Sequence, residues 1–182
     1  VVAGWLQTGD MGYVTDKHPG YLWEEGRFKS LLISADGEKY SPEGFEDSLT
    51  DGSKYIEQVI LHNNQDPYTI VLIVPNKEAL KEYVKGLGID AQTQAGKQAM
   101  LQKIQDEVNE YRHGKYAGMF PEQWLPKAIA VLPEAFTEQN HIVKSTMKIV
   151  RGKVEEYYAD RIEYAYTLEG KELMNEKNMA AL

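Results

Sequence analysis

Residues 55–74, YIEQVILHNNQDPYTIVLIV, are the stretch of sequence that decides the fold. Two apolar runs rich in β-branched residues, YIEQVILH and TIVLIV, flank the turn-forming segment NNQDPY, which predicts two strands joined by a turn. The second run is almost wholly apolar, as is typical of a central strand that is covered on both faces. We therefore expect these strands to form the core of a small sheet.

Helical periodicity appears on both sides of these strands. Pro42 opens PEGFEDSL, where proline suits a first helical turn and apolar residues recur four apart, so a short helix is predicted there. We expect amphipathic helices over residues 77–87 and 95–112, a strand over 127–133, and a last amphipathic helix from Arg151. The apolar faces of the helices at 77–87 and 95–112 are expected to consist of Leu80, Tyr83, Val84, Leu87, Met100, Ile104, Val108 and Tyr111.

The two ends of the chain complete the predicted order of elements. Residues 1–40 contain short apolar runs between turn-forming clusters, which predicts short β-hairpins. The tail after Gly170 is weakly helical, and we expect it to be frayed. The order of hairpins, then β-β-α-α-β-α, predicts an α+β fold, in which a small β-hairpin region precedes a small mixed sheet packed with helices.

Composition and charge exclude several classes of protein. The 182 residues include 20 Lys and Arg against 28 Asp and Glu, and the net charge of −8 is the wrong sign for a protein that binds nucleic acid by neutralising phosphates. The chain has no cysteine and therefore no disulfide or thiolate nucleophile. With no signal peptide and no long apolar run, we expect a cytoplasmic protein. Because VVAGWLQ opens inside a motif without Met, we also expect a piece of a longer chain.

Two turns that contain glycine could bring polar groups to a ligand. In GWLQTGD we expect a buried strand that breaks into a turn at residues 8–10, where the Asp10 carboxylate offers two acceptor oxygens to the vicinal hydroxyls of a ribose. The alternative is that Asp10 caps its own turn. Asp36 and Gly37 read as a tight turn between strands, which explains them fully, although Gly37 would also permit close approach of the backbone to a ligand.

Two groups of basic residues could hold an anion. Arg27 and Lys29 lie two apart in EGRFKS, so an extended chain would present both on one face. Residues 144–153, KSTMKIVRGK, contain four basic residues, and Lys148 is expected on a loop just before the helix that begins near Arg151. An ammonium group on such a loop could offset developing negative charge. For each group the alternative is a solvated surface.

Other catalytic signatures are missing from the sequence. The histidines have no metal-ligand spacing, so we expect no metal site within the chain. Neither a G-x-x-x-x-G-K phosphate loop nor a G-x-S-x-G element occurs. The histidines are His18, His62, His113 and His141.

The order of the motifs is more specific than any one of them. GWLQTGDMG, GYLWEEGRFKSLLI and GEKYSPEGFED are followed more than a hundred residues later by STMKIVR. In this order they resemble the C-terminal part of the adenylate-forming superfamily, which includes acyl-CoA synthetases, luciferases and peptide-synthetase adenylation domains. The helical insertion at residues 76–126 and the ending TMKIVRGKVEEYY are most similar to long-chain fatty-acid CoA ligases.

The resemblance implies a role for five residues. Asp10 would hold the ribose hydroxyls of ATP or AMP, and Arg27 would also bind the ribose. Lys29 would be the hinge about which the small domain rotates. Gly37 would approach the pantetheine of CoA in the thioester-forming state. Lys148 would be the catalytic lysine that reaches the acyl carboxylate and the α-phosphate during adenylation.

The resemblance also implies how the chain is organised and what it acts on. Residues 1–28 would end the nucleotide-binding region and supply linker strands, residues 29–182 would form a C-terminal lid domain, and a large N-terminal domain would be absent from this chain. The whole protein would be an ATP-dependent, AMP-forming ligase that joins a long-chain fatty acid to CoA. ATP and Mg²⁺ would be bound mainly by the missing domain, and association with a membrane surface through that domain is compatible with this interpretation.

Two other interpretations stay open on the sequence. The first is an aryl or short-chain acyl ligase of the same superfamily, because the acyl pocket would lie in the missing domain. The second is a free-standing, non-catalytic module that binds a nucleotide or CoA. In the ligase interpretation the isolated fragment is expected to be inactive.

Overall fold

The computed structural model describes residues 4, 8–17, 19–27, 30–145 and 148–182. Its central sheet has the strand order β5-β6-β7, with β5 at Ile56–His62, β6 at Ile70–Pro75 and β7 at Ala128–Val131. Strands β5 and β6 are antiparallel, whereas β6 and β7 are parallel. The predicted mixed sheet and its central strand are confirmed.

Strand β6 lies between two hydrophobic cores. All six of its residues are buried. Val71 and Ile73 contribute to one core, and Ile70, Leu72 and Val74 contribute to the other. Successive side chains of a strand point to opposite faces, so the continuous apolar run TIVLIV supplies both layers at once.

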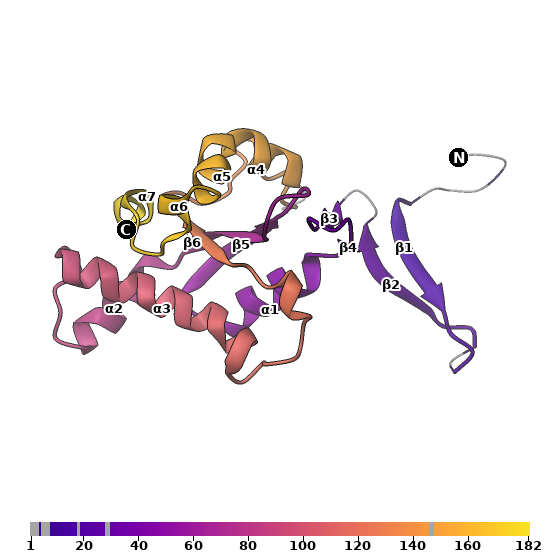
Figure 1. Ribbon diagram of the computed structural model, residues 1–182, viewed down its shortest axis with the longest axis horizontal. Coiled ribbons are helices and arrows are strands. Elements are labelled where there is room, and N and C mark those ends of the chain that lie inside the picture. The colour runs from indigo at the N-terminus through magenta and orange to yellow at the C-terminus, as the bar shows by residue number, and fades with distance from the viewer. Residues whose placement is uncertain (1–3, 5–7, 18, 28–29, 146–147) are drawn as a thin grey trace.

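The first core is covered by the helices that Figure 1 shows below the sheet, which are α1 at Glu43–Gly52, α2 at Lys77–Gly86 and α3 at Gln94–His113. Six of the eight expected apolar positions in α2 and α3 are buried, and Tyr83 is partly buried. Leu87 is 53% exposed, so its placement was wrong. Helix α2 ends at Gly86, and Leu87 therefore leaves the helical face.

The second core is covered by α4 at Arg151–Tyr157 and α5 at Ala159–Ala165, above the sheet in Figure 1. The sequence predicted one helix here, but the helix is interrupted at Tyr158, where φ is −106° and ψ is 23°. Val154, Tyr158 and Ile162 nevertheless pack together in this core, as the periodicity indicated.

The C-terminal tail is ordered, so the expectation of fraying was wrong. Helix α6 at Leu168–Lys171 is followed by α7 at Glu176–Ala181. Asn178 of α7 is fully buried, and its side chain accepts from the N–H of Val131 at 2.8 Å and donates to the carbonyl of Ile129 at 3.0 Å. These bonds satisfy polar groups of β7, which is an edge strand of the sheet.

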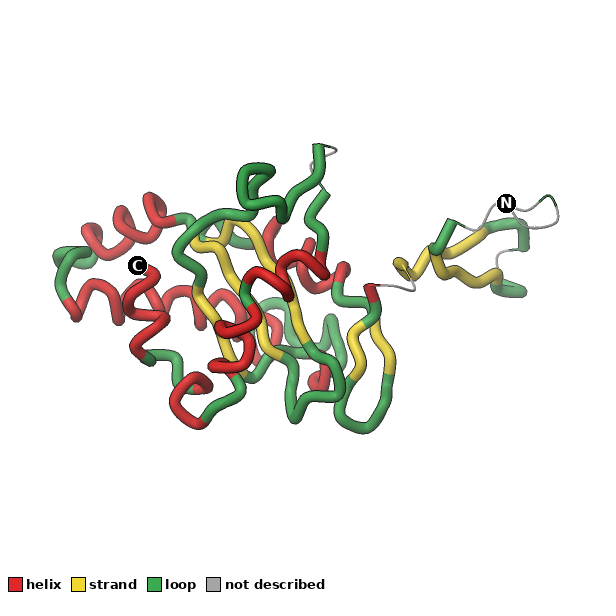
Figure 2. The backbone as a smooth tube through the Cα atoms, turned by 90° about the horizontal axis from the view of Figure 1, so that it is seen from above, coloured by secondary structure: helices red, strands yellow, loops and turns green. Residues whose placement is uncertain are grey.

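The first forty residues form two hairpins, as predicted. Strands β1 at Asp10–Val14 and β2 at Leu22–Arg27 form one, and β3 at Leu32–Ile33 and β4 at Lys39–Tyr40 form the other. In Figures 1 and 2 the β1–β2 hairpin projects away from the helical body. The buried strand expected before residues 8–10 falls on residues 5–7, outside the described residues. Within the described part of the chain, no helix is long and apolar enough to cross a membrane.

Candidate functional site

Lys148 lies on an exposed loop between β7 and α4, as predicted. Val143 and Ile149 form an antiparallel bridge at the base of this loop. The N–H of Lys144 donates to the carbonyl of Lys148 at 3.0 Å, and the N–H of Val150 donates to that of Ile142 at 2.8 Å. Residues 143–149 are called the Lys148 loop below; its positions 146–147 lie outside the described residues.

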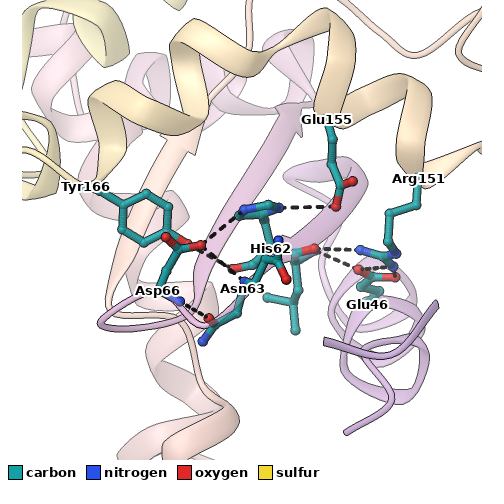
Figure 3. Close-up of polar contacts among 9 residues, drawn as sticks. Glu46, His62, Asn63, Asp66, Arg151, Glu155 and Tyr166 are labelled. Carbon is teal, nitrogen blue, oxygen red and sulfur yellow. Dashed lines mark hydrogen bonds and ion pairs between the residues drawn. The ribbon is translucent and has the colours of Figure 1, made fainter. Parts of the chain in front are cut away.

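Just after the Lys148 loop, Arg151 begins α4 and forms an ion pair with Glu46. Its Nη2 lies 2.7 and 2.8 Å from Oε1 and Oε2 of Glu46 in α1, and its Nη1 donates to the carbonyl of Leu61 in β5 at 2.5 Å (Figure 3). The N–H of Leu61 donates to Glu46 Oε1 at 2.6 Å. Burial raises the pKa of Glu46 above its ordinary value, although Arg151 acts in the opposite direction. Arg151 is thus part of a largely buried ion pair.

His62 lies near this pair, at the end of β5, between two carboxylates (Figure 3). Its Nδ1 lies 3.2 Å from Glu155 Oε1, and its Nε2 lies 3.4 Å from Asp66 Oδ2. The hydrogen bond with His62 lowers the pKa of Glu155. Tyr166 donates its hydroxyl to the carbonyl of His62 at 3.4 Å. These contacts give His62 a structural role, and no group of three or more His, Cys, Asp or Glu among the described residues could hold a metal ion.

Gly37 lies in the turn of the β3–β4 hairpin, which confirms the predicted tight turn. Residues 34–38, called the Gly37 turn below, are closed by their own hydrogen bonds: the N–H of Ser34 donates to the carbonyl of Glu38, and the N–H of Gly37 donates to that of Ser34, each at 2.9 Å. A hydrogen bond from the Ser34 hydroxyl lowers the pKa of Asp36. Gly37 has a φ of +87°, a left-handed conformation that favours glycine.

A distant segment supports the Gly37 turn. Trp124, at the end of the 3-10 turn η2 (Glu122–Trp124), stacks on Tyr40 with ring centroids 5.1 Å apart and an interplanar angle of 11°. Its Nε1 donates to Glu38 Oε1 at 3.3 Å. Tyr40 itself is 2% exposed. The insertion predicted at residues 76–126 therefore reaches back to the hairpin that carries Gly37.

Asp10 and Arg27 lie opposite each other at one end of the β1–β2 hairpin. Asp10 is exposed, begins β1, and donates its N–H to Thr8 Oγ1 at 3.2 Å. The structure places the backbone of Arg27 at the last position of β2. Lys29 lies outside the described residues.

Among the residues that the structure describes, Asp10, Gly37 and Lys148 do not line one cavity. In Figure 2 the β1–β2 hairpin lies beyond one end of the body, and the Lys148 loop and the Gly37 turn project from opposite sides of it. Two surface pockets of about 310 and 280 Å³ are lined by other residues, mainly from α3 with β7 and from α3 with α1. Among the described residues, the segments that carry Asp10, Gly37 and Lys148 therefore lie apart.

Sequence reasoning missed the two contacts that support these segments. It grouped Arg151 with basic residues that could hold an anion or form a solvated surface, whereas the structure pairs Arg151 with Glu46, which is 8% exposed. A signal existed in α1, because Glu46 follows Phe45 on the edge of an apolar stripe, and a buried carboxylate needs a partner. Trp124 gave no such signal, since nothing in the sequence near residue 124 indicates contact with residues 38–40.

A protein-family model described as the AMP-binding enzyme C-terminal domain matches residues 29–170. The chain belongs to this family. The match confirms the resemblance to adenylate-forming enzymes, and it leaves the β1–β2 hairpin and the tail that contains α7 outside the matched residues.

Curated relatives of this family member include acyl-activating enzymes and fatty-acid ligases. The chain is 28% identical over 180 residues to probable acyl-activating enzyme 16, chloroplastic, of Arabidopsis thaliana, and 29% identical over 168 residues to long-chain-fatty-acid–CoA ligase 1 of Homo sapiens. Each alignment covers 90% of this chain and 23% of the relative. The chain thus spans about a quarter of the length of these curated relatives.

Solved structures support the same fold. The adenylation domain of a carboxylate reductase from Mycobacterium chelonae matches with a TM-score of 0.69 and 26% identity, over 87% of this chain and 22% of that chain. An adenylation and carrier didomain of a carboxylic acid reductase from Segniliparus rugosus matches with a TM-score of 0.63 and 23% identity, over 88% of this chain and 20% of that chain. The predicted α+β fold is confirmed.

Proposed function

We propose that this chain is the C-terminal portion of an ATP-dependent, AMP-forming acyl-CoA ligase that activates a long-chain fatty acid. Residues 29–182 would form a lid that closes on a large N-terminal domain. The family match from residue 29 supports this boundary, and the fourfold greater length of the relatives supports the further domain. The similarity to a human long-chain-fatty-acid–CoA ligase supports the class of acid.

In this proposal, the β1–β2 hairpin is the last part of the nucleotide-binding region. Tyr21 and Leu22 are 70% and 74% exposed, and a hairpin with such apolar residues on its surface needs a covering partner. Asp10 and Arg27 are direct cross-strand neighbours, and the Cβ atoms of such pairs lie about 5 Å apart. This backbone pairing supports the proposal that both residues bind one ribose of ATP or AMP.

Lys148 acts in the first half-reaction. An oxygen of the fatty-acid carboxylate attacks the α-phosphorus of ATP, the bond to the β-phosphate breaks, and pyrophosphate leaves, so that an acyl-adenylate remains. The ammonium group of Lys148 offsets the negative charge that develops between carboxylate and phosphate. Its exposed position on a loop with a firmly bonded base is the observation that carries this assignment. Mg²⁺ accompanies ATP, and in the proposal the N-terminal domain holds it.

The second half-reaction uses the opposite side of the lid. The CoA sulfur, as its proton leaves, attacks the acyl carbon, a thioester forms, and AMP departs. Rotation about Lys29 withdraws the Lys148 loop and brings the Gly37 turn toward the pantetheine chain. The projection of these two segments from opposite sides of the body supports such an exchange.

Replacement of Lys148 in the full-length protein tests the proposal. ATP–pyrophosphate exchange with palmitate should fall about 10²- to 10³-fold in Lys148→Ala, while thioester formation from supplied palmitoyl-adenylate and CoA should be unchanged. Lys144→Ala is the matched control, because Lys144 is exposed on the same loop. The isolated 182-residue chain should catalyse neither half-reaction.

Two results would contradict this assignment. Equal losses in both half-reactions would show that Lys148 has no specific role in adenylation. Equal losses in Lys144→Ala and Lys148→Ala would show that only the charge of the loop matters. A full-length protein with normal exchange but no transfer to CoA would instead favour an adenylating enzyme with another acceptor, as the similarity to a carboxylate reductase suggests.

A further inference from the structure

We propose that Arg151 is a positioning residue for Lys148, and that the ion pair with Glu46 fixes the end of the Lys148 loop in the orientation that adenylation needs. The inference rests on the proposed function, because it requires that Lys148 acts in that step. It assigns a role to a cation that touches neither substrate nor nucleotide.

The two stems of the Lys148 loop are held in different ways. On the first stem Ile142 is fully buried and Val143 is 9% exposed, so the second core holds it by burial of apolar side chains. On the second stem Ile149 and Val150 are only partly buried. Ile149 packs against the second core, but only as a partly buried side chain. The second stem therefore depends in addition on its hydrogen bonds to the first stem and on a polar anchor after Val150.

That anchor is Arg151, and it is bound at three acceptor atoms. Its guanidinium contacts both carboxylate oxygens of Glu46 and the carbonyl of Leu61, and the side chains of Arg151 and Glu46 are only 16% and 10% exposed. Leu61 in turn holds Glu46 through its N–H. A planar guanidinium that is bound at two ends cannot rotate without breaking a contact.

The anchor lies close enough to Lys148 to determine its position. Arg151 follows Lys148 by three residues, and an extended chain spans at most about 3.5 Å per residue. A shift at Arg151 can therefore displace the backbone of Lys148. A misplacement of about 1 Å at a reacting group can cost about 10²-fold in rate.

The same ion pair also joins α4 to α1 and β5, so a general role in stability must be separated from positioning. The two roles are separated by replacing Arg151 both in the presence and in the absence of the Lys148 ammonium group. If Arg151 acts through Lys148, its replacement has no further effect once the Lys148 ammonium is gone. If it acts only on stability, the two losses multiply, because independent effects on free energy add.

The experiment uses the full-length protein and four variants, Lys148→Ala, Arg151→Lys, Glu46→Gln and the double variant Lys148→Ala/Arg151→Lys. Arg151→Lys retains the charge but loses the fork. We expect ATP–pyrophosphate exchange with palmitate, at saturating ATP and acid, to fall about 10- to 100-fold in Arg151→Lys. Thioester formation from supplied palmitoyl-adenylate should stay within about twofold, and exchange in the double variant should equal that in Lys148→Ala.

Glu46→Gln and one further variant, Lys103→Ala, keep the test decisive. Glu46→Gln retains an oxygen that can accept from the N–H of Leu61. It should lower ATP–pyrophosphate exchange less than Arg151→Lys does and should also leave thioester formation unchanged. It therefore allows the test if Arg151→Lys does not fold. Lys103→Ala removes another largely buried pair, with Glu107 at 2.6 Å in α3, and should leave the ratio of the two half-reactions unchanged.

The outcomes distinguish this inference from the proposed function. If Lys148→Ala leaves exchange intact, the proposed function fails and the inference fails with it. If Lys148→Ala lowers exchange as proposed, but exchange in the double variant is lower still, or Arg151→Lys lowers both half-reactions equally, only the positioning role is overturned.

Discussion

The Lys148 loop and the Gly37 turn project from opposite sides of one domain, and they are held by different physical interactions. The Gly37 turn closes on itself through backbone hydrogen bonds between Ser34, Gly37 and Glu38. Aromatic stacking of Trp124 on Tyr40 supports it from outside. The Lys148 loop has apolar burial on its first stem, but its second stem ends at an ion pair.

Both supports converge on helix α1. Tyr40, which Trp124 covers, ends β4 just before α1, and Glu46, which binds Arg151, lies within α1. The comparison indicates that stacking tolerates small displacements of the hairpin, whereas a guanidinium bound to both Glu46 oxygens and to the carbonyl of Leu61 holds the end of the loop more tightly. We therefore expect the two sides of the lid to respond differently to replacement of their supports.

The largest effect is expected at the ion pair. Glu46→Ala leaves the Arg151 guanidinium largely buried without a counter-charge, and such a loss costs roughly 3–5 kcal/mol of the free energy of unfolding. Urea denaturation of the 182-residue chain measures this value. The double variant Glu46→Ala/Arg151→Met removes both charges and should be more stable than Glu46→Ala alone. A single variant that loses less than about 1 kcal/mol would show that this pair does not hold the two elements together.

A smaller effect is expected on the other side, at Trp124. Trp124→Ala removes the stack on Tyr40 and the hydrogen bond to Glu38, and should cost about 2 kcal/mol because the indole is only partly buried. In the full-length protein it should slow thioester formation and spare ATP–pyrophosphate exchange.

Trp124→Phe is the matched control, because it keeps a ring over Tyr40 and loses only the bond from Nε1. It should retain most of the stability and most of the thioester formation. If Trp124→Ala instead lowered exchange as strongly as thioester formation, the two sides of the lid would not be independent.

The sequence alone predicted the strands and helices in which buried residues recur at a regular spacing. The run TIVLIV predicted the central strand because β6 alternates between two cores, and the spacing of Met100, Ile104 and Val108 predicted α3 because one face of that helix is buried. Asp36 and Gly37 predicted the hairpin turn because the chain there needs a positive φ. In each case local chemistry and tertiary structure agree.

The sequence was insufficient where a polar residue is stabilised by a partner distant along the chain. Arg151 looked like a surface cation until the structure paired it with Glu46, 105 positions earlier. The weakly helical tail after Gly170 was expected to be frayed, yet the Asn178 side chain within it bonds to Val131 in β7, which is 47 positions away. Such pairings have no periodic signature, and only the fold brings the partners together. The roles of Lys148, Asp10, Arg27, Lys29 and Gly37 stay predictions.

The smallest effect is expected at Gly37, where a substitution tests backbone strain separately from side-chain packing. A Cβ added at Gly37 would meet nothing within 4 Å, and the same is true at Gly152 in α4. The two positions differ in φ, which is +87° at Gly37, whereas Gly152 is helical. Gly37→Ala should therefore cost about 1 kcal/mol through the left-handed conformation alone, and Gly152→Ala should stabilise the chain by about 0.5 kcal/mol through helix propensity. Urea midpoints of the two variants measure both values. Equal shifts would mean that the turn relaxes to a negative φ, and that its geometry is less firmly set than its hydrogen bonds indicate.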